Sequence, residues 1–143
     1  MLDLSDPIQA RIAERLQRAE YAFLTTVRPD GRPHTVPVCY LWEAGAILIY
    51  SQPVGVKVSN LRQSPRVSLA LDQTGDEDFF PVVVEGTAEL LSESDADLTY
   101  PPYAQKYTSL FQRMFGSDLP PDSFARQFSQ AIRITPTRIR HDD

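Results

Sequence analysis

The chain has 143 residues, of which 42% are hydrophobic and 23% charged, a length and composition that suit one soluble globular domain spanning residues 1–143. Its formal net charge of −5 argues against a general nucleic-acid binder, and its single cysteine and two histidines make a disulfide or a Cys/His zinc site unexpected. No leader pattern opens the sequence and no apolar run approaches membrane-spanning length, so we expect a cytoplasmic protein without membrane contact.

The first predicted element is a helix. Asp6 can cap its start, Pro7 suits its first position, and Gln9 sits where a capping-box partner belongs. An apolar stripe follows with one residue on each turn: Ile8, Ile12 and Leu16. Charged residues lie off this stripe: Arg11, Glu14, Arg15 and Arg18. We therefore expect a helix that docks on the core and carries no chemistry.

Two strands are predicted next, over residues 21–27 and 32–42. The turn between them places Pro29 where φ near about −65° is wanted and Gly31 where a left-handed residue fits. Pro33 and Pro37 cannot donate to a ladder, so the second strand must be interrupted or lie partly on a sheet edge. Main-chain groups left free by an interruption could hydrogen-bond a planar heterocycle.

The segment 47–69 carries the most informative pattern. It predicts a strand over 47–50, a Pro- and Gly-containing break over 51–55, and a two-turn helix over 56–63 that ends before Pro65. Lys57 falls in the first turn of this helix, where unpaired N–H groups and a partial positive charge disfavour a cation. An anion bound there by the amides, Lys57 and the Ser51 hydroxyl would make the position favourable for a cation. The alternative is a solvated surface lysine.

Charge segregation favours the anion site. Between Gly31 and Leu71 the only acid is Glu43, against four cations: Arg32, Lys57, Arg62 and Arg66. This window carries +3, against −8 for the rest of a chain whose total is −5. A segment with so few acids has a positive local potential, which suits an anionic ligand. The alternative is chance, together with the rarity of acids in strands.

The second half predicts two strands, over 66–72 and over 80–91, the latter broken or bulged near Gly86. A helix over 99–115, starting at Pro101 or Pro102, has an apolar stripe typical of a core or a subunit interface: Tyr103, Tyr107, Leu110, Phe111 and Met114. A short helix over 121–128 and a strand over 131–140, bent at Pro136, complete the chain. We expect an α+β, mainly β fold: a six-stranded barrel with flanking helices.

No catalytic constellation is present in the sequence. His141 lies in the tail, and Cys39 is expected to be a small buried apolar residue. His34, beside Pro33, could line a site but is more typical of a surface strand histidine. The nucleophile-elbow, zinc-protease and dinucleotide-binding motifs are absent from the sequence. This absence suits redox chemistry on a bound flavin-like ring, where the cofactor supplies the difficult step and the protein binds and aligns it.

Four segments together resemble the pyridoxamine 5'-phosphate oxidase-like proteins, which have a flavin-binding split β-barrel. They are A-F-L-T-T-V-R-P-D-G-R-P-H-T-V-P-V (22–38), I-Y-S-Q-P-V-G-V-K-V-S-N-L (49–61), S-P-R-V-S-L (64–69) and V-E-G-T-A-E-L (84–90). Two further segments are similar to the subgroup that depends on the deazaflavin coenzyme F-420: W-E-A-G-A-I-L-I-Y-S-Q-P (42–53) and I-R-I-T-P-T-R-I-R (132–140). The resemblance covers nearly the whole chain.

The resemblance implies a homodimer with two cofactor sites at its interface. It implies that Lys57 and Ser51 hold the cofactor phosphate with Tyr50 and Gln52 beside them. The main chain that lies against the ring system is implied to be that of Val36, Pro37 and Val38. A dimer is also expected because the predicted helix over 99–115, with a Pro-interrupted small barrel, bears more apolar surface than one small core hides. The aromatic residues that make up this surface are Tyr103, Tyr107, Phe111 and Phe115.

The function that the resemblance implies is hydride transfer between reduced F-420 and a small electrophilic organic substrate. Arg62 and Arg66 could meet the glutamate-bearing tail of F-420; the alternative for both arginines is a solvated face. The alternatives are an FMN-dependent oxidoreductase of the same fold and a non-catalytic flavin- or haem-binding protein. The chain is shorter than true pyridoxamine phosphate oxidases and lacks their C-terminal substrate-binding segment, so their reaction is not expected.

Overall fold

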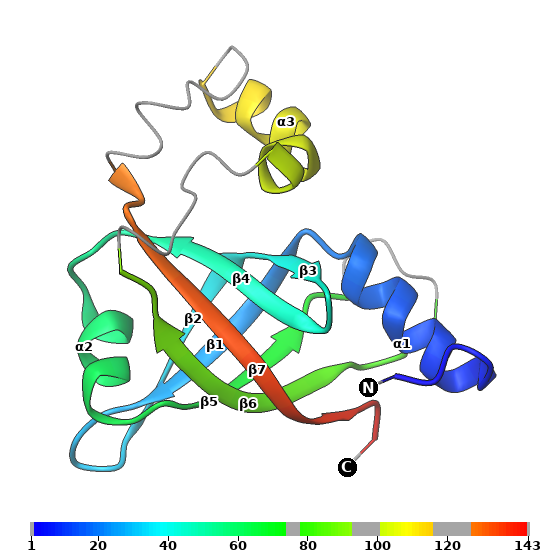
Figure 1. Cartoon of the computed structure of the whole chain (residues 1–143), viewed down its shortest axis with the longest axis horizontal. Helices are drawn as coiled ribbons and strands as arrows, with labels where there is room; N and C mark the ends of the chain where they lie inside the picture. Colours follow the sequence, from blue (N-terminus) through cyan, green and yellow to red (C-terminus); the bar gives the residue numbers. More distant parts are fainter. Residues whose placement is uncertain (1, 74–77, 93–100, 116–126, 143) are drawn as a thin grey trace.

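Seven antiparallel strands form one sheet in the order β2-β1-β5-β6-β7-β4-β3 in the computed structural model, which describes residues 2–73, 78–92, 101–115 and 127–142. The strands are β1 (Tyr21–Val27), β2 (Pro33–Cys39), β3 (Leu41–Glu43), β4 (Ala46–Ser51), β5 (Arg66–Leu71), β6 (Val83–Leu90) and β7 (Gln130–Arg140). The helices are α1 (Pro7–Arg18), α2 (Val56–Gln63) and α3 (Pro101–Phe115). The sheet curls into a split barrel, with α1 and α2 on opposite sides and α3 beyond β4 (Figure 1). None of these helices is long and apolar enough to cross a membrane.

The predicted mainly β barrel is confirmed, with seven strands in place of six. The additional strand arises because the predicted strand over 32–42 is divided at Tyr40. Its first part, β2, pairs with β1 as far as Cys39, and its second part, β3, pairs with β4 from Leu41 onward. One continuous segment therefore lies at both edges of the sheet and connects them through Tyr40, with no ladder between β2 and β4 among the described residues. The prediction that this strand is interrupted and on an edge is confirmed.

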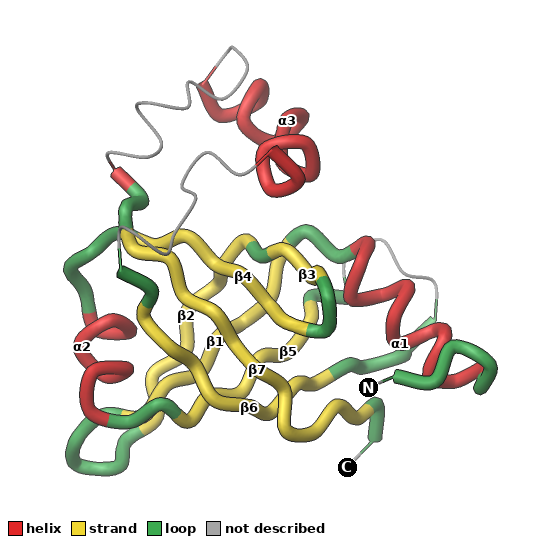
Figure 2. Tube along the Cα trace, in the orientation of Figure 1, coloured by secondary structure: helices red, strands yellow, loops and turns green. Residues whose placement is uncertain are grey.

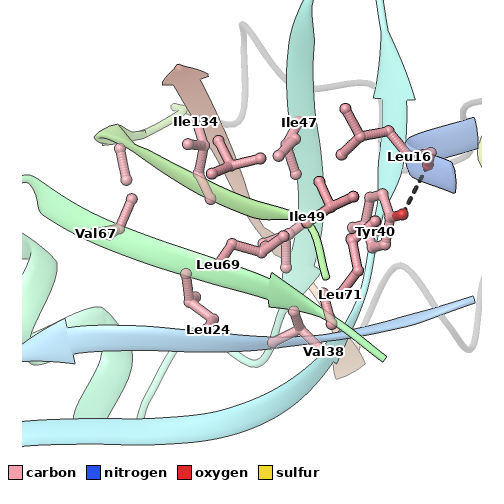
Figure 3. Close-up of a cluster of buried hydrophobic side chains, with 14 of the residues drawn as sticks. Leu16, Leu24, Val38, Tyr40, Ile47, Ile49, Val67, Leu69, Leu71 and Ile134 are labelled. Atoms are coloured by element: carbon pink, nitrogen blue, oxygen red, sulfur yellow. Dashed lines mark hydrogen bonds between the residues drawn. The ribbon is translucent and has the colours of Figure 1, made fainter. Parts of the chain in front are cut away.

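The main chain of Tyr40, where the partner changes, is held by α3. Its N–H donates to the Tyr107 hydroxyl at 2.7 Å, and that hydroxyl lies 2.5 Å from the Tyr40 carbonyl and 2.8 Å from the Glu20 carbonyl. One hydroxyl proton serves one of these two acceptors at a time. Lys106 Nζ donates to the same Tyr40 carbonyl at 3.0 Å. The Tyr40 hydroxyl in turn donates to the Leu16 carbonyl at 2.7 Å (Figure 3). Burial raises the pKa of both tyrosines, so both stay protonated as these bonds require.

The described residues form two apolar clusters. Alternating strand residues point into the barrel and form the larger one (Figure 3), which includes Leu24, Val38, Ile47, Ile49, Val67, Leu69, Leu71 and Ile134. The smaller cluster lies between α3 and the sheet and consists of Leu41, Tyr50, Tyr103, Tyr107, Leu110 and Ala131. The apolar stripe of α3 is thus buried within its own chain at Tyr103, Tyr107 and Leu110; the side chains of Phe111, Met114 and Phe115 lie outside the described residues.

Helix α1 begins at Pro7 as predicted but faces the core differently. The Asp6 carboxylate accepts from the amides of Ile8 and Gln9, which confirms the cap. Gln9 Oε1 accepts from the amide of Asp3, so its expected capping-box bond to Asp6 was wrong. Ile8 is 49% exposed, whereas Arg15 is 2% exposed and donates to the carbonyls of Phe80 and Asp72 at 3.0 and 3.2 Å. The buried guanidinium is satisfied by main-chain oxygens from a distant part of the chain. The periodicity of the helix alone could not predict that Arg15 would be buried.

The predicted irregularity at Gly86 is confirmed. The β6–β7 register shifts between Glu85 and Gly86, and Gly86 faces Pro136. A Cβ added at Gly86 would lie 2.5 Å from the Thr135 carbonyl oxygen, so only glycine fits this close approach. Strand β6 starts at Val83 and not at residue 80. The predicted helix over 121–128 falls mostly outside the described residues.

We expect Tyr107→Phe to lower the free energy of unfolding by about 1–3 kcal/mol, because the buried N–H of Tyr40 loses its acceptor. Urea unfolding followed by circular dichroism measures this change. Tyr21→Phe is the matched control, because that ring is 37% exposed and its loss of a hydroxyl should change stability by less than about 0.5 kcal/mol. Equal unfolding midpoints for Tyr107→Phe and wild type would show that α3 does not secure the barrel.

Candidate functional site

Two strand edges lack a ladder partner within the described part of the chain, and we call them the split edges. The first is the outer edge of β2 over 33–39, since β2 pairs with β1 alone. The second is the edge of β4 over 49–51, since the β3–β4 ladder stops at Leu48. Both start from the junction at Tyr40, where one segment passes from β2 to β3. Main-chain groups on unpaired edges are available to a ligand.

All seven residues of the predicted site lie on the split edges or on the segment that follows β4. The loop after β4 leads directly into α2 (Figure 2). The β2 edge carries Val36, Pro37 and Val38. The β4 edge and the start of α2 carry Tyr50, Ser51, Gln52 and Lys57. The structure therefore places residues from two distant parts of the sequence at one opening, and their contact with a cofactor stays a prediction.

The register of the β1–β2 hairpin decides which main-chain groups face the β2 edge. The Arg28 amide donates to the Arg32 carbonyl at 2.9 Å, so Arg28 and Arg32 form a hydrogen-bonded pair. Because such pairs alternate along an antiparallel ladder, Val36 and Val38 direct their main-chain groups toward β1. Pro37, paired with Phe23, lies between these hydrogen-bonded pairs, so its carbonyl points away from β1 and faces the split. Of the three predicted residues, only Pro37 therefore has a main-chain acceptor directed at the split, and its contact with a ring stays a prediction.

The side chains on the β4 edge are engaged within the chain. The Tyr50 ring packs edge-to-face on Tyr103 with their centroids 4.7 Å apart, in the cluster under α3. Ser51 is 2% exposed, and its hydroxyl donates to the Gln52 carbonyl at 2.9 Å. Gln52 itself is exposed. The Tyr50 ring is therefore occupied by packing within the chain, while the Ser51 hydroxyl can still accept a hydrogen bond or donate to an acceptor other than the Gln52 carbonyl.

Lys57 sits at the uncapped start of α2. The helix has no acid in its first turn, and no side chain of the described residues caps its first amides. Its N-cap is Gly55 with φ 154°, a conformation that glycine adopts most readily. Burial lowers the pKa of the half-buried Lys57, and no carboxylate of the described residues forms an ion pair with it. An ammonium at the positive end of a helix is unfavourable without an anion, so this arrangement fits a bound phosphate.

Three cations on α2 or directly after it have no ion-pair partner among the described residues: Lys57, Arg62 and Arg66. In the same part of the chain, six arginines elsewhere pair with carboxylates: Arg11, Arg18, Arg32, Arg113, Arg133 and Arg140. Arg32, counted in the acid-poor window, pairs with Asp30 at 2.7 Å. The uncompensated positive charge of the acid-poor window is therefore carried by Lys57, Arg62 and Arg66. Such a group suits a ligand with several negative charges.

Two polar residues near the split are outside the predicted site. Asn60 is 3% exposed, and its Nδ2 donates to Thr26 Oγ1 at 2.9 Å. His34 faces Thr26 across the β1–β2 ladder, and its Nδ1 is buried without a hydrogen-bond partner in the described chain. The spacing of Lys57 and Asn60 on one helix face was a usable signal. The position of His34 required the hairpin register.

We expect Lys57→Met to raise the stability of the ligand-free protein at pH 7 by about 0.3–0.5 kcal/mol, a figure reduced for solvent screening of a half-exposed group. The folded pKa of Lys57 lies below its unfolded value, so the protonated form is penalised and wild type gains stability relative to the variant as pH rises toward 10.5. Urea unfolding at pH 7 and pH 10 measures both effects. Arg62→Met, in the last turn of α2, is the control and should not stabilise. A Lys57→Met protein less stable than wild type at pH 7 would contradict the uncompensated charge.

Comparison with known proteins identifies the fold. Residues 8–142 match the pyridoxamine 5'-phosphate oxidase family. No curated protein matches the chain. Among solved structures, an F-420 reductase is 24% identical, covers 90% of this chain and 95% of its own, and superposes with a TM-score of 0.63. A conserved hypothetical protein from Mycobacterium tuberculosis is 28% identical, with coverage of 92% and 81% and a TM-score of 0.65.

A third similar structure differs in what it binds. HutZ, the haem storage protein from Vibrio cholerae, is 18% identical, with coverage of 94% of both chains and a TM-score of 0.65. At these identities the structural likenesses establish the fold and leave the cofactor open. The sequence match, by contrast, extends over nearly the full length and includes both split edges and α2. The chain therefore belongs to the pyridoxamine 5'-phosphate oxidase family.

Proposed function

We propose that this protein is an oxidoreductase that uses coenzyme F-420 for hydride transfer to or from a small organic substrate. The observation that carries the proposal is the group of cations without ion-pair partners in the described chain: Lys57 and Arg62 on α2, the helix that follows the β4 edge, and Arg66 directly after it. Family membership supports a flavin- or F-420-related oxidoreductase at a coarse level.

The residues present fit a phosphate-bearing cofactor of this kind. A bound deazaflavin or flavin ring would supply the hydride chemistry. The first-turn amides of α2 and the Lys57 ammonium would bind its phosphate, with Ser51 and Gln52 beside them. The Pro37 carbonyl would accept a hydrogen bond from a ring N–H. No side chain is assigned to catalysis, because alignment of cofactor and substrate is the contribution expected of the protein.

The two exposed arginines favour F-420 over FMN. Both cofactors carry a phosphate for Lys57, but the F-420 tail adds glutamate carboxylates. Arg62 and Arg66 are exposed, and neither has an ion-pair partner in the described residues, so both are available to such a tail. FMN would leave them without a role. An FMN-dependent oxidoreductase remains the runner-up, and its cheap signature is a yellow protein with a flavin spectrum on purification.

A non-catalytic haem protein receives less support from the candidate axial ligands. Burial raises the pKa of the Cys39 thiol to about 11, so a thiolate ligand is disfavoured near neutral pH. The His141 ring stacks on Phe80 at 5.0 Å, and Phe80 also contacts Arg11 of α1, which lies on the opposite side of the sheet from α2 (Figure 1). His34 has the geometry to reach a ligand. A Soret band that appears when haem is added would favour this alternative, as the similarity to HutZ allows.

We expect fluorescence titration to show tighter binding of F-420 than of FMN. Lys57→Met should weaken both by about ten- to a hundredfold, since a charge-assisted contact is worth about 1.5–3 kcal/mol. The double variant Arg62→Ala, Arg66→Ala should weaken F-420 more than FMN and reduce the salt dependence of F-420 binding. Arg138→Ala, an exposed arginine on β7, is the control and should change neither affinity.

Two outcomes would contradict this assignment. Micromolar binding of FMN with no binding of F-420 would make the protein a flavin enzyme. Equal affinities of wild type and Lys57→Met for both cofactors would leave Lys57 a surface lysine and the phosphate site misplaced.

We infer a homodimer with cofactor sites at its interface. The expected reason, an unburied stripe on α3, does not hold for Tyr103 and Tyr107, which are 3% and 0% exposed within the chain. The outer face of β1 and β2 provides a better one: Tyr21 and Phe23 are 37% and 42% exposed, and Pro37, opposite Phe23, is exposed too. A two-fold contact over this face would cover apolar surface adjoining the β2 split edge.

Multi-angle light scattering should show a dimer of wild type at micromolar concentration. Phe23→Ser should shift it toward monomer, because the apolar contact at the centre of the patch is lost. Phe79→Ser removes an aromatic ring that is 85% exposed but lies outside this face, so it should leave the dimer intact. A monomeric wild type would exclude both the dimer and shared cofactor sites.

A further inference from the structure

The two ring nitrogens of His34 have different surroundings. Nδ1 is buried and has no hydrogen-bond partner in the described part of the chain. Nε2 is not among the buried, unpartnered atoms, and the residue as a whole is partly exposed. The imidazole therefore turns Nδ1 toward the interior and Nε2 toward solvent, at the β2 split edge. Unpartnered polar atoms in folded proteins are uncommon and call for a specific explanation.

A row of polar residues leads from the buried side of this ring to α2; its members are His34, Thr26, Asn60 and Lys57. His34 lies opposite Thr26 in the β1–β2 ladder, so both side chains are on one face of the sheet. Thr26 is 0% exposed, and its hydroxyl oxygen accepts from Asn60 Nδ2 at 2.9 Å. Asn60 lies one helical turn after Lys57. The row from His34 to Lys57 thus connects the β2 edge with the proposed phosphate site.

The surroundings also favour one tautomer. Neutral imidazole has a proton on one nitrogen and a lone pair on the other. A buried N–H without an acceptor is rarer in proteins than a buried acceptor without a donor, which places the proton on Nε2. His34 then presents an outward N–H donor. The one acid of the acid-poor window, Glu43, lies at the far end of β3 and does not compete for it.

We propose that His34 donates its Nε2–H to an oxygen of the phosphate-bearing chain of the cofactor. This inference rests on the proposed function, because it requires such a cofactor at the split. The Asn60–Thr26 bond shows that the His34 end of β2 is the end nearer α2. At a rise of about 3.3 Å per residue, His34 lies about 10 Å from Pro37 along the strand. It therefore faces the chain that leads to the phosphate and not the ring at Pro37. His34 is a binding and positioning residue, not a catalytic one.

A pair of amide variants tests the contact. The side-chain nitrogen of Gln can occupy the place of Nε2, whereas that of Asn corresponds to Nδ1. We expect His34→Asn to weaken binding of FMN and of F-420 by about tenfold or more in fluorescence titration, as for loss of a charge-assisted hydrogen bond. His34→Gln should restore most of the affinity. Thermal melting of the ligand-free variants checks that each is folded.

The outcomes separate this inference from the proposed function. If wild type binds a cofactor and His34→Asn binds it equally well, or if both variants are equally weak, the inference is overturned and the proposed function stands. If wild type binds neither FMN nor F-420, the proposed function fails and the inference with it.

A measurement on the native residue covers the case of variants that do not fold. The chain has two histidines, so His141→Gln leaves His34 as the single imidazole. In protein labelled with ¹⁵N-histidine, saturating FMN should shift the Nε2 resonance and slow exchange of its proton. Fluorescence confirms binding of the cofactor in the same sample. An unchanged Nε2 resonance with FMN bound would overturn the contact.

Discussion

The change of strand partner at Tyr40 is the constraint on which the rest of the structure depends. The β1–β2 ladder ends at Cys39 and the β3–β4 ladder begins at Leu41, so neither completes the main-chain bonding of the residue between them. Tyr40 is 0% exposed, and an unpaired N–H there would cost about 1–3 kcal/mol. The Tyr107 hydroxyl supplies the acceptor. Helix α3 is therefore part of what holds the barrel, and the same change of partner creates the unpaired edges of the site.

Departures from ordinary stability rules gather near these edges. Helix α1 has a carboxylate cap and α2 has none, although α2 carries a lysine in its first turn. His34 Nδ1 is buried without a partner in the described chain. Each feature costs stability in the ligand-free protein, and a bound phosphate-bearing ligand would offset the charge at α2 by mass action. Arginines elsewhere in the described chain mostly follow the rules, with a carboxylate or carbonyl partner.

What the sequence could predict was local. The bounds of α2 matched at both ends, because Gly55 and Pro65 act on their own neighbours. The bulge at Gly86 was recognisable for the same reason. The division at Tyr40 and the burial of Arg15 were not, because each depends on groups from distant segments: the Tyr107 hydroxyl in one case and the carbonyls of residues 72 and 80 in the other.

The site was predictable to a similar degree. Family resemblance pointed to segments on both split edges, but it could not separate main-chain groups that face β1 from those that face the opening. That separation follows from hairpin register, as does the place of His34 opposite Thr26. The cofactor is a different kind of question. An F-420 reductase and a haem storage protein share this barrel, so the fold alone does not select between their ligands.

The prolines of β2 connect sequence, fold and site. If the β3–β4 register were continued past Leu41 and Leu48, Cys39 would face Tyr50 and Pro37 would face Gln52, and the barrel would close. The main-chain groups of Pro33 and Pro37 point away from β1, toward the split. Neither residue has an N–H to donate across it. Closure of the ladder, or addition of a strand from another molecule, is disfavoured for the same reason. The carbonyl of Pro37 nevertheless remains as an acceptor, so the residue that keeps the split open also provides a contact within it.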